Sequence, residues 1–364
     1  MYTKALFTLI ILSISGFALN KTTNNKRFYE KDNEQYILQH DFDQGYELEN
    51  NIKQDGYNTP GRIAVENSWD VFTEASFIYW NTKETGLDIA YKKSKTVDYY
   101  NSNFIKMNFD YHPGFQLGLG LKLDHDDWEF FSQYTWLHFN DNFNADSDSH
   151  FYLIPLWIKD VSQTSEYAAS HVTGHWNFKI SLWDFLEIGR SFYVGKALIV
   201  KPFIGGRSFW LNQKFNASYV IDSVNKISHN SSESWAIGPK IGVNSKWLLG
   251  YNFRLFANLD IALTYQRFKA KTTQSNPIED SFIEIASKSY GLLTPQLTIK
   301  PGIGWGSYFN NNASHIDFSL SCDFSHFWYQ NAMRNLKDAS ALLIDSNFGN
   351  LMFHGLTITM RFDF

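Results

Sequence analysis

Three things are scarce in this chain of 364 residues: cysteine, long apolar runs and an excess of positive charge. The only cysteine, Cys322, cannot form a disulfide within the chain, so a disulfide framework is excluded. Beyond the first nineteen residues no stretch approaches about 18 consecutive apolar residues, the usual mark of a transmembrane helix. There are 32 Lys and Arg residues against 37 Asp and Glu residues, a balance that lacks the electrostatic footprint of a nucleic-acid-binding protein.

Aromatic residues, in contrast, are abundant at 18% of the chain, although the mean hydropathy is slightly polar at −0.32. So many rings with so little net hydrophobicity are unusual in a cytosolic enzyme. The combination is typical of strands whose residues alternate between lipid and water.

The first residues have the pattern of an export signal. Lys4 gives a positive start, an apolar run follows to Leu19, and the small residues Gly16 and Ala18 suit cleavage after Ala18. We therefore expect a signal peptide at residues 1–18. Residues 19–67 are polar and show no sustained period, so we expect a leader that is flexible or folded back on a larger domain at 68–364.

From Trp69 onward the sequence repeatedly alternates apolar and polar residues, which predicts strands with one apolar face. In the clearest segment, 114–123, four leucines share one face with Phe115, and Gln116 and Lys122 lie on the other. Strand patterns of this kind cover ten segments: 69–80, 114–123, 127–139, 171–182, 197–211, 234–246, 252–268, 288–304, 315–329 and 350–364.

The connections between these segments alternate in length. Long ones cover 81–113, 140–170, 212–233, 269–287 and 330–349, and shorter ones lie between them. This alternation is typical of an outer-membrane protein with short periplasmic turns and long external loops. The prediction is an all-β fold, a transmembrane antiparallel β-barrel of about 10–12 strands (range 10–14). A hairpin of 86–92 with 102–110 would give twelve strands, and 183–196 could hold a short helical turn.

Strand length and tryptophan spacing favour lipid over a soluble β-sandwich. Segments of 10 to 17 residues suit tilted strands that cross a bilayer, whereas sandwich strands are usually shorter. Trp69 and Trp80 bracket the first segment, and Trp235 and Trp247 bracket another, so we expect these rings at the two membrane interfaces.

The second face of the strands carries charged side chains, which a membrane-spanning strand tolerates only toward a wet interior. Two interpretations remain open: a charged pore lining that tunes ion preference, or a network of ion pairs that fills a narrow lumen. The residues expected to line the pore are Lys122, Lys201, Arg207, Lys240, Arg254, Asp260, Asp317, Asp323 and Arg361, with Glu74 and Asp363 on the same face.

The chain ends inside an amphipathic strand, on an aromatic residue and without a polar tail. Leu356, Ile358, Met360, Phe362 and Phe364 share the apolar face of this segment. We expect it to be the closing strand of the barrel, paired with the first strand so that no edge remains.

Five aromatic-rich blocks occur in a fixed order along the chain, at 69–90, 113–138, 187–211, 235–250 and 355–364. Together they resemble the Legionella-type pore-forming major outer membrane proteins, a family also found in chlamydia-related bacteria. The resemblance implies an outer-membrane barrel of a Gram-negative bacterium that forms a pore and has no enzymatic activity or cofactor. It also implies that the aromatic-ended last strand is recognised by the barrel-assembly machinery.

Three functions therefore stay in view. The first is a pore for passive diffusion of small hydrophilic solutes or ions, alone or as a homo-oligomer. The second is a structural or adhesive surface barrel whose external loops contact host or envelope partners. The third is a hydrolase that uses His138, His171 or His326 near the strand ends. No metal site or nucleotide-binding motif is expected.

Overall fold

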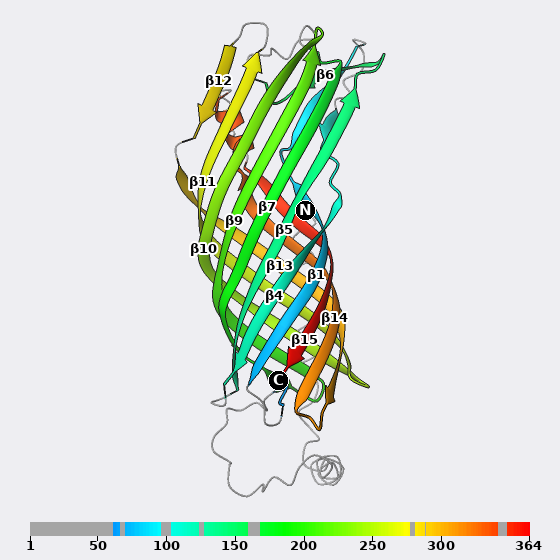
Figure 1. Ribbon diagram of the computed structural model, residues 1–364, viewed down its shortest axis with the longest axis vertical. Helices are drawn as coiled ribbons and strands as arrows, with labels where there is room; N and C mark the ends of the chain where they lie inside the picture. The colour runs from blue at the N-terminus through cyan, green and yellow to red at the C-terminus, as the bar shows by residue number, and fades with distance from the viewer. Residues whose placement is uncertain are drawn as a thin grey trace, which may run out of the picture. The chain divides into compact units, whose positions relative to one another are not determined.

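A closed antiparallel barrel of ten strands forms the body of the computed structural model (Figure 1). The structure describes residues 61–65, 70–95, 103–123, 127–158, 168–276, 281–287, 289–340 and 348–364. The barrel strands are β1 (Val71–Glu84), β4 (Tyr111–Lys122), β5 (Trp128–Asp146), β7 (His171–Arg190), β9 (Leu198–Ile221), β10 (Val224–Gly250), β11 (Phe253–Asn276), β13 (Tyr290–Phe309), β14 (Ser314–Asn331) and β15 (Gly349–Asp363). Each of the ten predicted segments lies within or largely overlaps one of these strands, and the predicted fold class is confirmed.

The last strand closes the ring by pairing with the first. The register runs from Phe72 opposite Asp363 to Glu84 opposite Leu351 without interruption. Closure satisfies the backbone groups of both strands, which hydrocarbon requires because it offers no other partner. The expectation that the C-terminal segment closes the barrel is therefore confirmed.

Five strands, β5, β7, β9, β10 and β11, continue well beyond the segments predicted for them and rise above the rest of the barrel (Figure 1). The expected loop 212–233 is instead a long hairpin, in which Asp222 and Ser223 turn with positive φ between β9 and β10. The sequence pattern missed this because the apolar phase reverses on β9. Trp210 faces outward, whereas Phe215 and Tyr219 above it face inward and are buried.

The expected helical turn in 183–196 is also wrong. Strand β7 continues to Arg190, and a short strand β8 (Phe192–Val194) pairs with β9. The periodicity fails there because of a β-bulge: the register shifts between Phe185 and Ile188, and Leu186 has φ 48°.

An apolar belt surrounds the lower barrel, with half-exposed side chains on alternate positions of every strand. Its outer edge is marked by aromatic rings, Trp183, Trp210, Trp235 and Tyr265, and its periplasmic edge by Trp247 and Phe253. Trp80 does not join the outer edge, contrary to the prediction. Successive side chains of a strand point to opposite faces, so Trp80 cannot share the lipid face with Phe77 and Tyr79. Its ring points inward and donates a hydrogen bond to Thr357 at 3.0 Å.

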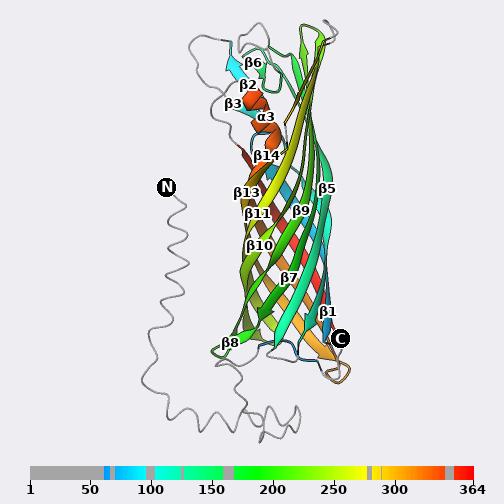
Figure 2. The same cartoon turned by 90° about the vertical axis from the view of Figure 1, so that its left-hand side faces the viewer.

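External segments fold into the outer mouth of the barrel (Figure 2). A small sheet of β2 (Asp88–Ser94), β3 (Asn103–Lys106) and β6 (Phe151–Pro155) lies there with the helix α3 (Ala332–Ser340). The suspected hairpin in 86–110 therefore exists, as β2 and β3, but it is not part of the barrel wall. A further strand, β12 (Ser281–Ala286), extends the wall beside β11.

The described part of the leader, residues 61–65, lies against the periplasmic turns. The backbone N–H of Gly61 donates to the carbonyl of Ser191 at 3.0 Å, and Arg62 forms an ion pair with Asp127 at 2.7 Å. The predicted signal peptide and residues 19–60 lie outside the described residues. Within the described residues no helix is long and apolar enough to cross a membrane.

Candidate functional site: the barrel lumen

The centre of the lumen holds a compact cluster of buried charges on β7, β9, β10 and β11. Arg207 forms two hydrogen bonds with Asp184, from Nε to Oδ1 at 2.6 Å and from Nη2 to Oδ2 at 2.9 Å. Lys240 Nζ lies 2.8 Å from Asp184 and 2.6 Å from Glu187. Asp260 adds a third carboxylate, 3.1 Å from Arg207. Two cations, from β9 and β10, thus cross-link three carboxylates, from β7 and β11.

A second group of ion pairs lies nearer the periplasmic end. Lys201 pairs with Glu129 and Arg254 with Asp317. Asp363 on the closing strand accepts hydrogen bonds from Arg361 at 2.7 and 3.0 Å. It also pairs with Lys122 on β4 at 2.7 Å.

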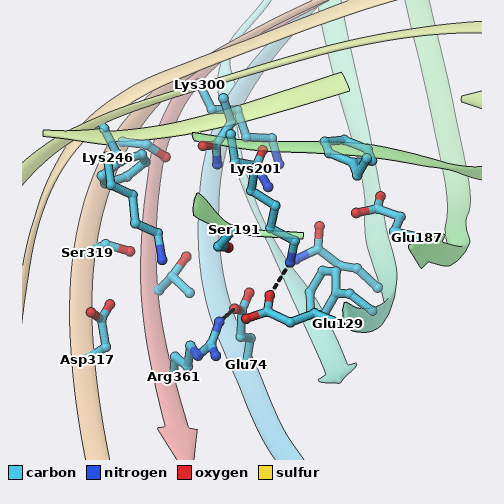
Figure 3. A pocket seen from close by; sticks show the side chains of 18 of the residues that line it. Glu74, Glu129, Glu187, Ser191, Lys201, Lys246, Lys300, Asp317, Ser319 and Arg361 are labelled. Atoms are coloured by element: carbon cyan, nitrogen blue, oxygen red, sulfur yellow. Dashed lines mark hydrogen bonds and ion pairs between the residues drawn. The ribbon is translucent and has the colours of Figure 1, made fainter. Parts of the chain in front are cut away.

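A cavity of about 180 Å³ lies among these groups, lined by carboxylates and cations in equal number (Figure 3). Arg361 lies beside Glu74, Lys201 reaches Glu129, and Lys246 also lines the cavity. Most of the lining cations have a carboxylate partner; Lys246 forms no ion pair with any described residue. The volume and the polar walls suit several ordered waters or small solutes.

Neutral polar side chains continue the lumen above the charges. Gln116 donates to Thr135 at 3.1 Å, and the amides of Gln266 and Gln330 meet at 2.9 Å. Thr264 and Thr294 share a hydrogen bond of 2.9 Å. These groups satisfy one another, so this level of the lumen is polar but without net charge.

Above this level the lumen is filled by an apolar plug. We use this term for β2, β3, β6, the residues 156–158 that follow β6, and α3. Trp157, Ile89 and Met333 of the plug are fully buried against wall residues such as Phe215 and Trp176. In this structure the outer mouth is therefore closed.

Among the described residues few hydrogen bonds join the plug to the wall. One runs from the backbone N–H of Ala169, just before β7, to the Leu153 carbonyl at 2.8 Å. The Tyr219 hydroxyl donates to the Ile89 carbonyl at 2.7 Å, and the Gln274 amide donates to the Trp157 carbonyl at 3.1 Å. Burial raises the pKa of the Tyr219 hydroxyl, so it stays a neutral donor at physiological pH. The plug is thus held mainly by apolar contacts.

One carboxyl group is buried beneath the plug, beyond the outer aromatic edge of the belt. Glu84 at the end of β1 accepts a hydrogen bond from the Gln213 amide at 3.1 Å, and its Oε2 has no partner among the described residues. Burial raises the pKa of Glu84 to about 8, although the bond from Gln213 opposes this shift. Glu84 is therefore mostly protonated at neutral pH.

The nine residues expected to line the pore all point into the lumen, and the structure brings eight of them together in these two charged groups. Asp323 lies near Lys300 at 3.7 Å and accepts a hydrogen bond from Thr357 at 2.8 Å. Their role in conduction stays a prediction. Most of the nine form ion pairs. The same residues therefore fit both interpretations of the charged face, a pore lining and a network of ion pairs that fills the lumen.

Sequence reasoning missed four functional candidates: Asp184, Glu187, Glu129 and Lys246. Asp184 and Glu187 lie three positions apart, which strict alternation would place on opposite faces. The bulge at Leu186 turns both into the lumen. The alternation of Trp183, Asp184 and Phe185 was the available signal that the strand continues.

The three histidines of the hydrolase hypothesis are not brought together. His171 pairs with Asp146 at 2.6 Å near the outer rim of the wall. His138 on β5 packs on Trp136, and His326 on β14 packs on Trp328. The strands β15, β1 and β4 separate β14 from β5 in the barrel wall. Among the described residues no group of three or more His, Cys, Asp or Glu could hold a metal ion.

Comparison with known proteins gives one family match and several structural likenesses. The family model described as "Legionella pneumophila major outer membrane protein precursor" matches residues 63–364. The outer membrane protease OmpT of Escherichia coli is 8% identical with a TM-score of 0.45, over 83% of this chain and 99% of that chain. No curated protein sequence matches.

Two further solved structures are similar at lower scores. A Pseudomonas aeruginosa FadL homologue is 6% identical with a TM-score of 0.22, over 80% of this chain and 89% of that chain. A TodX mutant, titled a monoaromatic hydrocarbon channel, is 8% identical with a TM-score of 0.24, over 80% and 90%.

Proposed function

The chain belongs to the family of the Legionella pneumophila major outer membrane protein, and from this premise we propose that it forms a gated pore. As a member of this family it is a β-barrel of the bacterial outer membrane, in contact with membrane lipid. The pore would carry small hydrophilic solutes or ions by passive diffusion, without enzymatic activity or a cofactor.

The observation that supports this proposal is the charged cavity inside the barrel. Its carboxylates and cations are equal in number, and Lys246 is without an ion-pair partner among the described residues. Such walls can replace part of the hydration shell of a small ion. A barrel stabilised only by its interior would not need a polar cavity, because apolar side chains could fill it.

The plug is the gate in this proposal. It closes the outer mouth mainly with apolar contacts, and the part of the chain that the structure describes adds few hydrogen bonds to the wall, so displacement of the plug breaks little directional bonding. Conduction then depends on how often the plug leaves the mouth. A narrow lumen with a mobile plug predicts short openings rather than a permanently open channel.

Single-channel recording on the refolded full chain in planar bilayers tests the pore. We expect brief openings from the native sequence and a several-fold larger open fraction from Trp157→Ala, which removes the largest ring of the plug core. The control is Tyr251→Ala, which removes a ring that is 96% exposed in a periplasmic turn. Silence from correctly folded protein of all three sequences would refute the pore.

A structural or adhesive role has its own support in the tall wall of β5, β7, β9 and β10. Beyond the belt its outward face bears a row of polar side chains, Asn142, His175, Asn216 and His229, joined by hydrogen bonds within two pairs. A shallow hollow of about 490 Å³ covers part of this row.

Changes confined to the outward polar row separate the two functions. Replacing Asn142, His175, Asn216 and His229 with Ala removes the row and keeps Tyr219, which contacts the plug. A pore predicts retained conductance, whereas an adhesive surface predicts loss of attachment to host cells. Normal attachment of this variant would count against the adhesive role.

A further inference from the structure

A stripe of exposed cations lies on the outward face of β11, immediately above the belt. Arg267, Lys269 and Lys271 occupy three successive outward positions beyond Tyr265, and all three are exposed. Arg267 is held by a hydrogen bond from Nε to the Ser289 hydroxyl at 2.7 Å. Nothing in the pore proposal uses this face.

Two more cations continue the stripe across the wall. In the strand register Lys179, Asn212, Glu233 and Lys269 form one row, and Asn177, Lys214, Ser231 and Lys271 form the row above it. Lys179 and Lys214 are both exposed. We call Lys179, Lys214, Arg267, Lys269 and Lys271 the cationic collar.

The collar keeps a net positive charge. Two carboxylates lie beside it: Glu233, opposite Lys269 in the register, and Glu284, which pairs with Lys271 at 2.9 Å. The Lys271–Glu284 pair is about half exposed, so solvent screens it and the pair contributes little. Five cations against two carboxylates leave an excess that can attract an anion.

The height of the collar identifies the layer it meets. The rings of Trp183, Trp210, Trp235 and Tyr265 are 42–49% exposed and mark the boundary of the hydrocarbon. A strand residue climbs about 2.5 Å at a barrel tilt near 40°. Arg267 and Lys269 therefore lie roughly 5 and 10 Å above Tyr265, at the depth of lipid head groups.

We propose that the collar binds the phosphate groups of the phosphorylated glycolipid of the outer leaflet. Lys and Arg at head-group depth recognise phosphate through charge-assisted hydrogen bonds. The two rows also carry Asn177, Asn212 and Ser231, whose amides and hydroxyl suit sugar hydroxyls rather than a single phosphodiester. This mixture favours a glycolipid over a glycerophospholipid.

The test uses the full-length barrel reconstituted in lipid discs that contain phosphorylated glycolipid. The bound glycolipid is counted by mass spectrometry after exchange into detergent. We expect Arg267→Ser combined with Lys269→Gln and Lys271→Gln to lose binding by on the order of fivefold per cation removed. The control combines Lys92→Gln, Lys93→Gln and Lys95→Gln, which removes three cations on or directly after β2 and leaves the collar intact.

Three results would overturn the proposal. One is equal glycolipid retention by the collar variant and the native sequence. Another is an equal loss in the control, which would assign the effect to net charge. The third is equal binding of dephosphorylated glycolipid or of an anionic glycerophospholipid. That result would show that the collar does not specifically recognise a phosphorylated glycolipid. Because the readout is bound lipid, a failed pore leaves this result unaffected.

Discussion

The Arg207 guanidinium and the Asp184 carboxylate meet side by side in the lumen, with two hydrogen bonds of 2.6 and 2.9 Å. The same carboxylate lies 2.8 Å from Lys240. Asp184 on β7 thereby joins β9 and β10 through one side chain. A carboxylate that holds two buried cations is the centre of this network.

Replacing Asp184 with Asn should destabilise the barrel by about 3 kcal/mol, because breaking a buried ion pair leaves an uncompensated charge. The measurement is the urea midpoint of the refolded protein. As a control, Glu284→Gln breaks the half-exposed pair with Lys271 and should cost less than about 1 kcal/mol. Similar costs for both variants would show that burial does not strengthen the central network.

Lys246→Glu should shift the ion preference of the pore toward cations. Lys246 faces the cavity without an ion-pair partner among the described residues, so reversing its charge alters the lumen without breaking a described pair. We expect a several-fold change in the cation-to-anion permeability ratio, measured as the reversal potential in a salt gradient. Lys83→Glu, with an exposed side chain outside the lumen, is the control. An unchanged reversal potential would mean that ions do not pass Lys246.

Raising the pH should open the plug, and Glu84 should be the cause. Its pKa is raised from 4.5 to about 8 in the closed form. Between these values the closed form holds a proton that an open, hydrated carboxyl would release, so the closed form loses stability as the pH rises. The closed-to-open ratio should fall by up to about tenfold per pH unit in this window.

Glu84→Gln keeps the shape of the side chain and removes the proton equilibrium. Its open fraction, recorded in bilayers from pH 5 to 9, should be flat where that of the native sequence rises. If Glu84→Gln retained the full pH dependence of the open fraction, another titratable group would have to cause it.

The barrel could be predicted because lipid imposes one rule on every strand. Leu117, Leu119 and Leu121 alternate with inward residues throughout the belt, and all three are about half exposed. The inner face also holds glycines where a neighbouring ring needs room. A side chain at Gly120 would collide with the Phe72 ring. Period two therefore located the strands and the charged lumen.

The rest of the fold departs from that rule for physical reasons. Above the belt, water lies outside and the plug lies inside. The outward apolar residues of β9 therefore end at Trp210, and Phe215 and Tyr219 above it are buried inside. Segments 88–94 and 151–155 pair with each other in the mouth, and no local pattern reveals such a long-range pairing. The bulge at Leu186 likewise hid Asp184 and Glu187 within an expected connection.

The final residue is positioned to complete the closing strand. The backbone N–H of Phe364 donates to the Val71 carbonyl at 3.2 Å, and its ring lies 5.4 Å from that of Phe362. These contacts add one hydrogen bond and one ring contact to an uninterrupted β1–β15 register. Their loss alone should cost only about 1–2 kcal/mol of barrel stability.

Deletion of Phe364 should nevertheless lower the amount of protein in the outer membrane several-fold, because we propose that the assembly machinery recognises the aromatic end of this strand. The measurements are outer-membrane levels in cells and the urea midpoint of the same variant refolded in detergent. Phe309→Ala is the control, because its ring also packs on Phe362, at 5.8 Å, and the terminus stays intact. Recognition of the terminus predicts low levels for the deletion alone, with nearly native stability. Equal outer-membrane levels of the deletion and of Phe309→Ala would mean that Phe364 contributes only its packing contact.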